Sequence, residues 1–422
     1  MSLTNIAINK EETTVFNELV NPSNVDNEPV NRWFSLKESY SSVLVEKLLN
    51  RYGNQPNKVL DPFLGAGTTL FKAWSLGIDG VGFDVNPIAI LISKVKTRCY
   101  EKNDINKLQN ILSEILNLNI KDHDYPGWNP MDKYIDKESL NILLTYRNYI
   151  DNIKENKVKN LLKLIWLSII EEVGYFKKSG NGIKKADANF SSKAIEELFK
   201  TKINGVISDI NSIIDKDIDY GKINIYENSS MNIDDYHTVD DIDAVITSPP
   251  YANCFDYFEV YKVELWMAGF VNSYDEWRNY KKRSMRSNMN AKLEDDDILD
   301  NKYFSQIIRI IKDKVEKGEI REKRVPTMLN NYFYDIKILL RKLKPKLNSG
   351  ATVSIVVGNS AYGGTVIPTD ELIASIGTNL GYEVCEVVKA RNLRTSPQQM
   401  KIMSEKDKKA LRESIVTLKL IK

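Results

Sequence analysis

The 422-residue sequence predicts an α/β protein built on an open, mostly parallel, Rossmann-like sheet. The first observation is a short apolar strand that runs into a glycine-rich turn and then into a helix. The second is that strand signals return after two long stretches with the hydrophobic period of helices. We therefore expect one sheet domain that is interrupted by two largely helical insertions.

The first half of the sheet is expected close to the N-terminus, as a strand, helix, strand and second helix in succession. A right-handed βαβ unit of this kind belongs to an open parallel sheet. The expected elements are a strand at 58–63, a helix at 68–76, a strand at 80–84 and a helix at 87–95, preceded by a helix at 35–49.

The other strands are expected later in the chain, at 223–226, 243–246, 351–357, 382–389 and 414–420. The last two fit an antiparallel hairpin that closes the edge of the sheet. The polar residues 1–34 are expected to form a loosely ordered lead-in. The sheet domain is then assembled from 35–99, 216–271 and 345–422, and the helical insertions cover 100–215 and 272–344.

Composition argues against several classes of protein. Lys and Arg total 59 against 57 Asp and Glu, so a nucleic-acid contact would need local basic patches. Three cysteines and two histidines are too few and too scattered for a disulfide framework or a metal centre, so no metal is expected. We see no signal sequence and no segment long enough to span a bilayer, which favours a cytoplasmic protein without membrane contacts.

The glycine-rich turn is Asp61-Pro-Phe-Leu-Gly-Ala-Gly-Thr-Thr69. Its glycines allow the backbone to approach a ligand, but the turn lacks the lysine of a phosphate loop and the third glycine of the dinucleotide fingerprint. Asp84 ends the next strand, where an acid hydrogen-bonds ribose hydroxyls in doubly wound folds. Asp84 is equally well explained as a cap of the following helix. Asp61 is either a turn former or a partner for the ammonium group of a ligand.

A second motif, Thr-Ser-Pro-Pro-Tyr, follows the apolar strand at 243–246. Two consecutive prolines force a rigid, extended turn. The Ser248 hydroxyl accepts and donates hydrogen bonds, and the ring of Tyr251 is suited to stacking on a base. Taken alone, the motif is better explained by an ordinary turn that leaves a strand.

Together, the glycine-rich turn, Gly-Phe-Asp-Val-Asn-Pro87 and Thr-Ser-Pro-Pro-Tyr251 resemble the amino-methylating DNA methyltransferases of bacteria and phages. The resemblance implies a class I methyltransferase sheet, S-adenosyl-L-methionine as cofactor and double-stranded DNA as substrate. It implies a catalytic loop of Ser248, Pro249, Pro250 and Tyr251. The cofactor contacts that it implies are Asp61, Phe63, Gly65, Gly67, Thr68, Thr69, Asp84 and Asn86, with Ser41 from the 37–42 segment and Asn228 beside the adenine.

The chemistry of such a loop is the positioning of a poor nucleophile. The lone pair of an exocyclic amine is delocalised into the base, and acceptors at Ser248 Oγ and the Pro249 carbonyl would direct it toward the methyl donor. A Ser-Pro-Pro loop resembles cytosine-N4 enzymes, whereas adenine-N6 enzymes more usually carry Asp or Asn at position 248. We expect N4 methylation of a flipped cytosine, in a nucleoid-associated restriction-modification enzyme with a cognate endonuclease as candidate partner.

Three alternatives stay open at this point: an adenine-N6 enzyme, an RNA methyltransferase, and a non-catalytic methyltransferase-like DNA-binding subunit. Both insertions are candidates for DNA recognition. Basic clusters at 278–286 and 177–185, and the polar stretch 391–399, have residue types that contact phosphates or base edges. Solvated charged surfaces explain them almost equally well. The residues expected at DNA are Arg283, Arg286, Lys184, Arg394 and Gln398.

Overall fold

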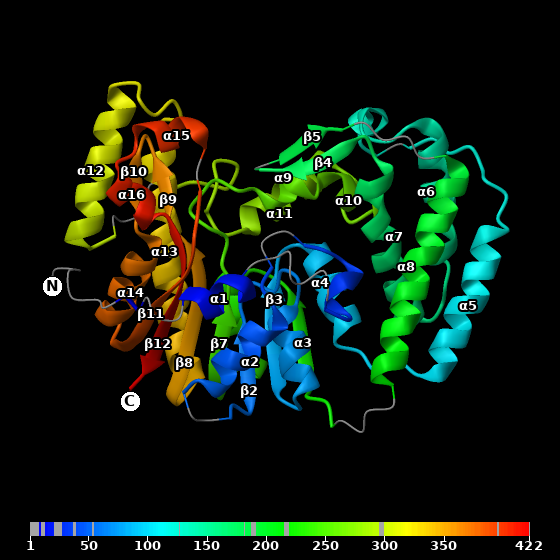
Figure 1. Ribbon diagram of the computed structural model, residues 1–422, viewed down its shortest axis with the longest axis horizontal. Coiled ribbons are helices and arrows are strands. Elements are labelled where there is room, and N and C mark those ends of the chain that lie inside the picture. Colours follow the sequence, from blue (N-terminus) through cyan, green and yellow to red (C-terminus); the bar gives the residue numbers. More distant parts are fainter. Residues whose placement is uncertain are drawn as a thin grey trace.

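The computed structural model describes residues 8–9, 13–20, 28–36, 39–52, 55–125, 127–180, 182–186, 191–214, 219–294, 299–394 and 396–421. An eight-stranded sheet forms its centre, in the order β1-β11-β12-β8-β7-β2-β3-β6 (Figure 1). The predicted α/β class is confirmed. The strands are β1 (Ile8–Asn9), β2 (Lys58–Asp61), β3 (Asp79–Asp84), β6 (Ile223–Glu227), β7 (Ile242–Thr247), β8 (Leu347–Gly358), β11 (Tyr382–Asn392) and β12 (Arg412–Leu420).

Seven of these strands run in one direction, and β12 runs against them. It pairs antiparallel with both β8 and β11, so the expected C-terminal hairpin is present. Its second strand, however, inserts between β8 and β11 instead of closing the edge. The edge is β1, which pairs parallel with β11. This corrects the expected placement of the hairpin, and the strand that takes the edge comes from the segment expected to be a loosely ordered lead-in.

One face of the sheet is covered by α1 (Thr13–Leu19), α2 (Ser42–Asn50) and α3 (Thr68–Ser75) (Figure 1). Phe16 and Leu44 from these helices share a core with Val59 of β2. The expected helix at 35–49 begins only at Ser42, because Ser41 is extended and accepts a hydrogen bond from the Val43 amide as its N-cap.

The other face is covered by α13 (Val325–Leu343) and α14 (Thr369–Asn379). Leu329 and Leu372 from these helices lie in one core with Leu60 and Val245 of the sheet. Leu60 follows Val59 directly but belongs to the opposite core, as the alternation of side chains along a strand requires.

The first insertion is largely helical, as predicted, and packs on α4 (Pro87–Lys96) through a continuous core that includes Ile92, Leu161 and Phe199. It also contains a hairpin at 176–185, where the sequence predicts no strand. The elements are α5 (Lys102–Leu116), α6 (Lys137–Asp151), α7 (Asn156–Val173), β4 (Phe176–Ser179), β5 (Gly182–Lys185) and α8 (Ser192–Ile213).

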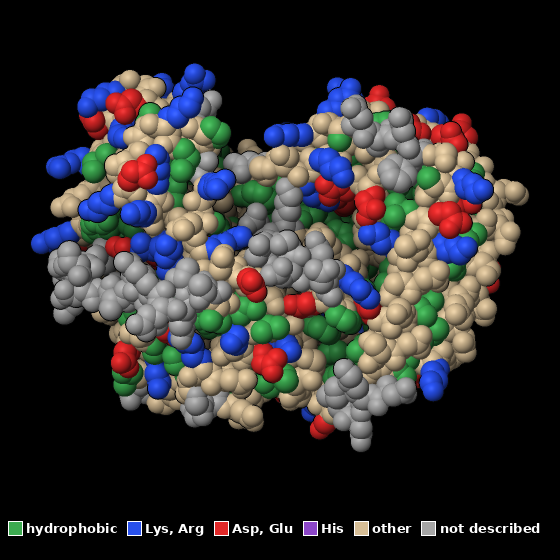
Figure 2. All heavy atoms as spheres, in the orientation of Figure 1, with side chains coloured by type: hydrophobic (Ala, Val, Ile, Leu, Met, Phe, Trp, Pro, Cys, Tyr) green, Lys and Arg blue, Asp and Glu red, His purple; other side chains and the backbone are tan. Residues whose placement is uncertain are grey.

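Part of the second insertion and part of the C-terminal segment form another lobe (Figure 1). Figure 2 shows a notch between this lobe and the first insertion, with Lys and Arg side chains on both sides. The elements of this lobe are α12 (Lys302–Glu316), β9 (Ser360–Tyr362), β10 (Thr365–Ile367), α15 (Pro397–Ile402) and α16 (Glu405–Ala410). The short helices α9 (Tyr257–Val260), α10 (Lys262–Met267) and α11 (Tyr274–Arg283) instead share the core of the first insertion. The 3-10 helices are η3 (Asn31–Trp33), η4 (Asn129–Lys133), η5 (Ser230–Asp235), η6 (His237–Val239) and η7 (Lys344–Lys346). In the part of the chain described, no helix is both long and apolar enough to cross a membrane.

Candidate active site

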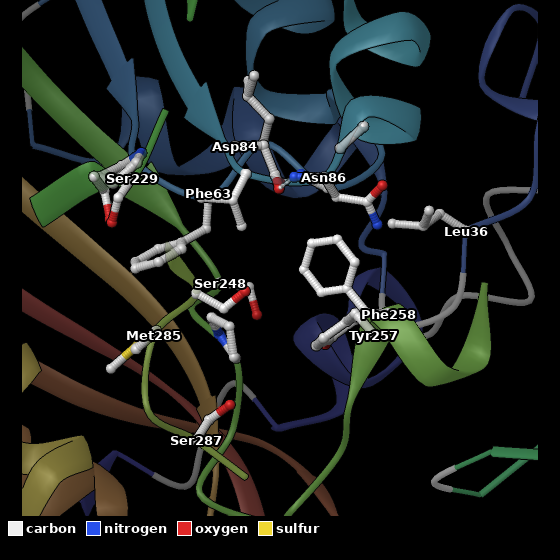
Figure 3. A pocket seen from close by; sticks show the side chains of 18 of the residues that line it. Leu36, Phe63, Asp84, Asn86, Ser229, Ser248, Tyr257, Phe258, Met285 and Ser287 are labelled. Carbon is white, nitrogen blue, oxygen red and sulfur yellow. Dashed lines mark hydrogen bonds between the residues drawn. The ribbon is translucent and has the colours of Figure 1, made fainter. Parts of the chain in front are cut away.

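A cavity of about 1070 Å³, open to solvent, lies at the carboxyl ends of β2, β3 and β7. Ligands bind at this end of the strands in open α/β sheets. The walls come from the glycine-rich turn, the start of α4, the turn after β7, α9 and residues 284–291. Figure 3 shows Asp84, Phe63 and Ser248 directed toward the same space, with the rings of Tyr257 and Phe258 reaching in from α9.

The glycine-rich turn enters α3 through two residues in the left-handed region, Gly65 (φ 48°) and Gly67 (φ 70°). Gly67 also lies against α4, because a Cβ there would be 2.6 Å from Ser93 Oγ. Gly65 and Thr68 line the cavity, whereas Gly67 supports the turn from behind. Thr68 Oγ1 is a buried oxygen with no hydrogen-bond partner within the described residues.

Asp84 joins the two loops that flank the cavity. One carboxylate oxygen accepts the Gly65 amide at 3.0 Å and the other accepts the Asn86 amide at 2.8 Å. The cap of α4 is Asn86, whose side chain accepts from the Ile88 amide at 3.0 Å. Asp84 is therefore not the helix cap. Burial raises the pKa of Asp84 to about 6, and its hydrogen bonds from backbone amides oppose that shift.

Asp61 lies behind the cavity lining and is 1% exposed. Its Oδ1 accepts from Thr247 Oγ1 at 2.8 Å and from the Phe63 amide at 3.1 Å, which ties the end of β2 to the end of β7. Its Oδ2 has no partner among the described residues. Burial raises the pKa of Asp61 to about 7, against the lowering effect of these hydrogen bonds.

The Thr-Ser-Pro-Pro-Tyr turn leaves β7 with Ser248 and Pro250 in the cavity wall. Ser248 Oγ donates its hydrogen toward the Val356 carbonyl at 3.1 Å or the Tyr251 hydroxyl at 3.4 Å. A hydroxyl has one hydrogen, so either bond leaves the lone pairs of Oγ available as acceptors. The side chain is thus oriented as an acceptor.

Tyr251 is held by the C-terminal strands. Its hydroxyl donates to Glu413 Oε1 at 2.5 Å, and Glu413 is paired in turn with Arg391. Its ring lies close to the backbone of Gly358, where an added Cβ would be 2.9 Å from two ring atoms. Tyr251 lines a smaller pocket beside Ser248, not the main cavity.

The expected site residues therefore separate into those at the cavity and those behind it. Of the latter, Ser41 caps α2 and donates to Glu28 at 2.5 Å. Thr69 donates to the Ile246 carbonyl and bonds to Tyr40. The expected residues that line the cavity are Phe63, Gly65, Thr68, Asp84, Asn86, Asn228, Ser248, Pro250 and Arg283; those outside its lining are Ser41, Asp61, Gly67, Thr69, Pro249 and Tyr251. Residues 37 and 38 of the 37–42 segment lie outside the described residues.

The residues expected at DNA differ in how available they are. Lys184 on β5 and Arg394 before α15 are exposed. Arg283 is exposed at the rim of the cavity and donates to the Glu227 carbonyl at 2.8 Å. The prediction that Arg286 contacts DNA is corrected, because its guanidinium is paired with Asp335 at 2.5 Å and its charge is used inside the protein. The side chain of Gln398 lies outside the described residues.

Two of the basic clusters are also partly neutralised. Lys178 is buried between Glu171 and Glu264, and Lys281 pairs with Asp256 and Glu259. The charges of these two lysines are therefore matched by acids within the protein, whereas Lys282 and Lys185 of the same clusters are exposed.

Some lining residues have no motif in the sequence. Ser39 and Tyr40 fall in the expected 37–42 segment, but Leu36 precedes it. The others lie far along the chain and reach the cavity only through the packing of α9 and of the segment after α11. They are Tyr257, Phe258, Met285, Ser287, Asn288 and Ala291.

Comparison with known proteins identifies relatives of this chain by sequence. No protein-family model matches the chain. It is 25% identical to the Type II methyltransferase M.BsoBI of Geobacillus stearothermophilus, covering 96% of this chain and 88% of that protein. It is 27% identical to the Type II methyltransferase M.AvaI of Nostoc, covering 85% and 80%. A stretch of 107 residues is 37% identical to M.MjaII of Methanocaldococcus jannaschii, covering 24% of this chain and 19% of that protein. The chain is therefore a homologue of Type II methyltransferases, related to them over most of its length.

Proposed function

We propose that this protein is an S-adenosyl-L-methionine-dependent methyltransferase that modifies an exocyclic amine of a base in duplex DNA, as part of a restriction-modification system. The observation that carries the proposal is that one cavity contains both Asp84, at the end of β3, and the acceptor-oriented hydroxyl of Ser248, after β7. The relatives, all named Type II methyltransferases, support the same reaction.

The walls of the cavity suit the cofactor in their chemistry. Asp84 retains lone pairs for ribose hydroxyls after accepting two backbone amides. Phe63 and Leu36 offer apolar surface, and the unpartnered Thr68 Oγ1 offers a hydrogen bond beside the glycine-rich turn. When bound, the cofactor supplies an electrophilic methyl group on a sulfonium.

The protein then has to position the amine. Ser248 Oγ accepts one amine hydrogen, because its own hydrogen is directed to the Val356 carbonyl or Tyr251. The second acceptor in this proposal is the carbonyl of Pro249, a residue outside the cavity lining that would have to turn toward the amine when the base binds. Two acceptors would direct the lone pair of the amine away from the ring. Proximity and orientation contribute a large share of the rate acceleration in such a step.

A base inside a duplex cannot reach this cavity, so it has to be flipped out of the helix. The notch between the two lobes gives a duplex access from the side on which the cavity lies (Figures 1 and 2). Lys184 on one side and Arg394 on the other are exposed cations suited to phosphate contacts.

Cytosine N4 is the favoured target, because the residue before the two prolines is a serine. Adenine N6 is the second candidate, since Ser and Asp both accept one amine hydrogen. A cognate restriction endonuclease is the expected partner in the cell.

The test is transfer of a labelled methyl group from the cofactor to duplex DNA, with RNA as the competing substrate. We expect label in DNA alone. Label in RNA alone would mean that the substrate is RNA and not DNA. Label in neither nucleic acid would contradict the enzymatic function.

A further inference from the structure

Outside the cavity, one buried carboxylate collects four hydrogen bonds from a distant segment. Asp209 on α8 is 2% exposed. Its Oδ2 accepts the Val30 amide at 3.0 Å, Arg32 Nε at 3.0 Å and Trp33 Nε1 at 2.9 Å, and its Oδ1 accepts from Arg32 Nη2. A buried carboxylate with this many donors fixes the backbone that supplies them.

The same short segment bonds to the sheet domain on its other side. Asn31 accepts from Lys96 Nζ at 3.2 Å, and Lys96 also donates to the Ala66 carbonyl in the glycine-rich turn at 2.8 Å. Glu28 accepts from Asn31 at 2.7 Å and from Ser41 at 2.5 Å. A chain of buried polar contacts therefore runs from the inserted helix to the turn that lines the cavity.

The segment also forms part of the cavity wall. Leu36 lines the cavity, and its side chain lies 3.5 Å from where a Cβ on Gly65 would be. Val30 is held at φ 67°, a conformation that a β-branched residue adopts only when its surroundings impose it. The hydrogen bond from its amide to Asp209 is one such constraint.

We propose that Asp209 is a positioning residue for the cofactor pocket: by fixing residues 28–36, the first insertion completes a wall of a site that none of its own described residues lines. Lys96 is the second link, because its contact with the Ala66 carbonyl joins residues 28–36 to the glycine-rich turn. Burial lowers the pKa of Lys96 to about 7, and the charge of Glu28 opposes this shift. The inference rests on the proposed cofactor.

The test is calorimetric binding of S-adenosyl-L-methionine to the full chain. Asp209→Ala should weaken binding about tenfold, the scale expected when buried N–H donors lose their acceptor. The turnover number at saturating cofactor should stay close to wild type. The matched control is Glu155→Gln, which breaks an ion pair with Lys107 in the same insertion, away from residues 28–36, and should bind normally.

Amide hydrogen exchange separates positioning from general unfolding. In Asp209→Ala, exchange should rise in residues 28–36 and 63–67 while α5 to α7 keep their protection. If that variant does not fold, Arg32→Met removes only one donor side chain, 43% exposed, and should show a smaller effect of the same kind. Normal binding by the folded variants, or exchange that rises throughout the chain, would overturn the inference. Absence of binding by the wild type would instead contradict the proposed function.

Discussion

At Ser248, a single hydrogen determines what the side chain offers to a ligand. The nearest acceptors of that hydrogen are the Val356 carbonyl and the Tyr251 hydroxyl, and Tyr251 is held in place by Glu413. The C-terminal strands therefore control the chemistry of a loop that begins after β7. The sequence motif identifies the loop, but only the fold reveals which strand receives its hydrogen.

Removal of the Ser248 hydroxyl should reduce methyl transfer while leaving cofactor binding intact. Ser248→Ala should lose about 100-fold in the single-turnover rate, because one pre-organised hydrogen bond to the reacting group is gone. The control is Ser284→Ala, which lines the same cavity but donates its hydroxyl to the Tyr280 carbonyl. Equal rates for Ser248→Ala and the wild type would remove Ser248 from the mechanism.

Cofactor affinity should depend on pH through Asp84. The folded-state pKa of about 6 lies above the ordinary value of 3.8, so ionisation of this carboxyl costs stability as the pH rises through about 6. Ribose hydroxyls favour the ionised form, because it accepts hydrogen bonds at both oxygens. The dissociation constant should therefore rise by up to about tenfold per pH unit below pH 6.

Titration calorimetry between pH 5 and about pH 8 measures this dependence, given the pKa range involved. Asp84→Asn is the control, since an amide does not titrate there. It should bind more weakly and lose the dependence near pH 6. An unchanged pH dependence of binding in Asp84→Asn would mean that another group titrates. The nearest such group in the site is Asp61, whose pKa is about 7.

Among the elements, the turn between β2 and α3 is the most constrained. Gly67→Ala should lower the free energy of unfolding by about 1–3 kcal/mol, from the left-handed backbone and the close approach of Ser93. Gly205→Ala is the opposite case, a helical glycine in α8 with open space around it, and should raise stability by about 0.5–1 kcal/mol. Urea denaturation measures both changes, and a neutral Gly67→Ala would contradict the role assigned to this turn.

The elements that the sequence predicts are those with a strong local pattern. The strands β2, β3 and β7 are short apolar runs bounded by turn residues, so the sequence alone predicts them as strands. The position of β12 between β8 and β11 is not visible in this way, because pairing order depends on contacts between distant segments. The sequence does not predict the hairpin β4–β5, because its lysines give this segment the composition of a loop. Lys178 is the exception, since it is buried.

The site shows the same division. The motifs predict Asp84 and Ser248 at the cavity, since each directly follows or ends a strand of the parallel sheet. Met285 and Ser287 reach the same cavity from a loop without a motif, and Asp209 acts from an inserted helix. The positions of such residues depend on tertiary packing, which no local pattern in a single sequence predicts.

For the whole molecule, the notch between the lobes is the expected path of the duplex. Lys184→Glu and Arg394→Glu change residues on opposite sides of the notch. Each should weaken DNA binding and reduce by about one the slope of log affinity against log salt concentration, because about one fewer counterion is released. Lys222→Glu is the matched control, because this exposed lysine precedes the amino end of β6, whereas the cavity lies at the carboxyl ends of the strands. Fluorescence anisotropy over a range of salt concentrations measures these effects, and wild-type behaviour of both variants would place the duplex elsewhere.

The most direct test of the central claim is mass spectrometry of nucleosides from duplex DNA treated with the protein and S-adenosyl-L-methionine. We expect N4-methylcytosine in the treated DNA and its loss with Ser248→Ala. N6-methyladenine in its place would contradict the assignment of the base, and DNA without any methylated amine would contradict the function itself.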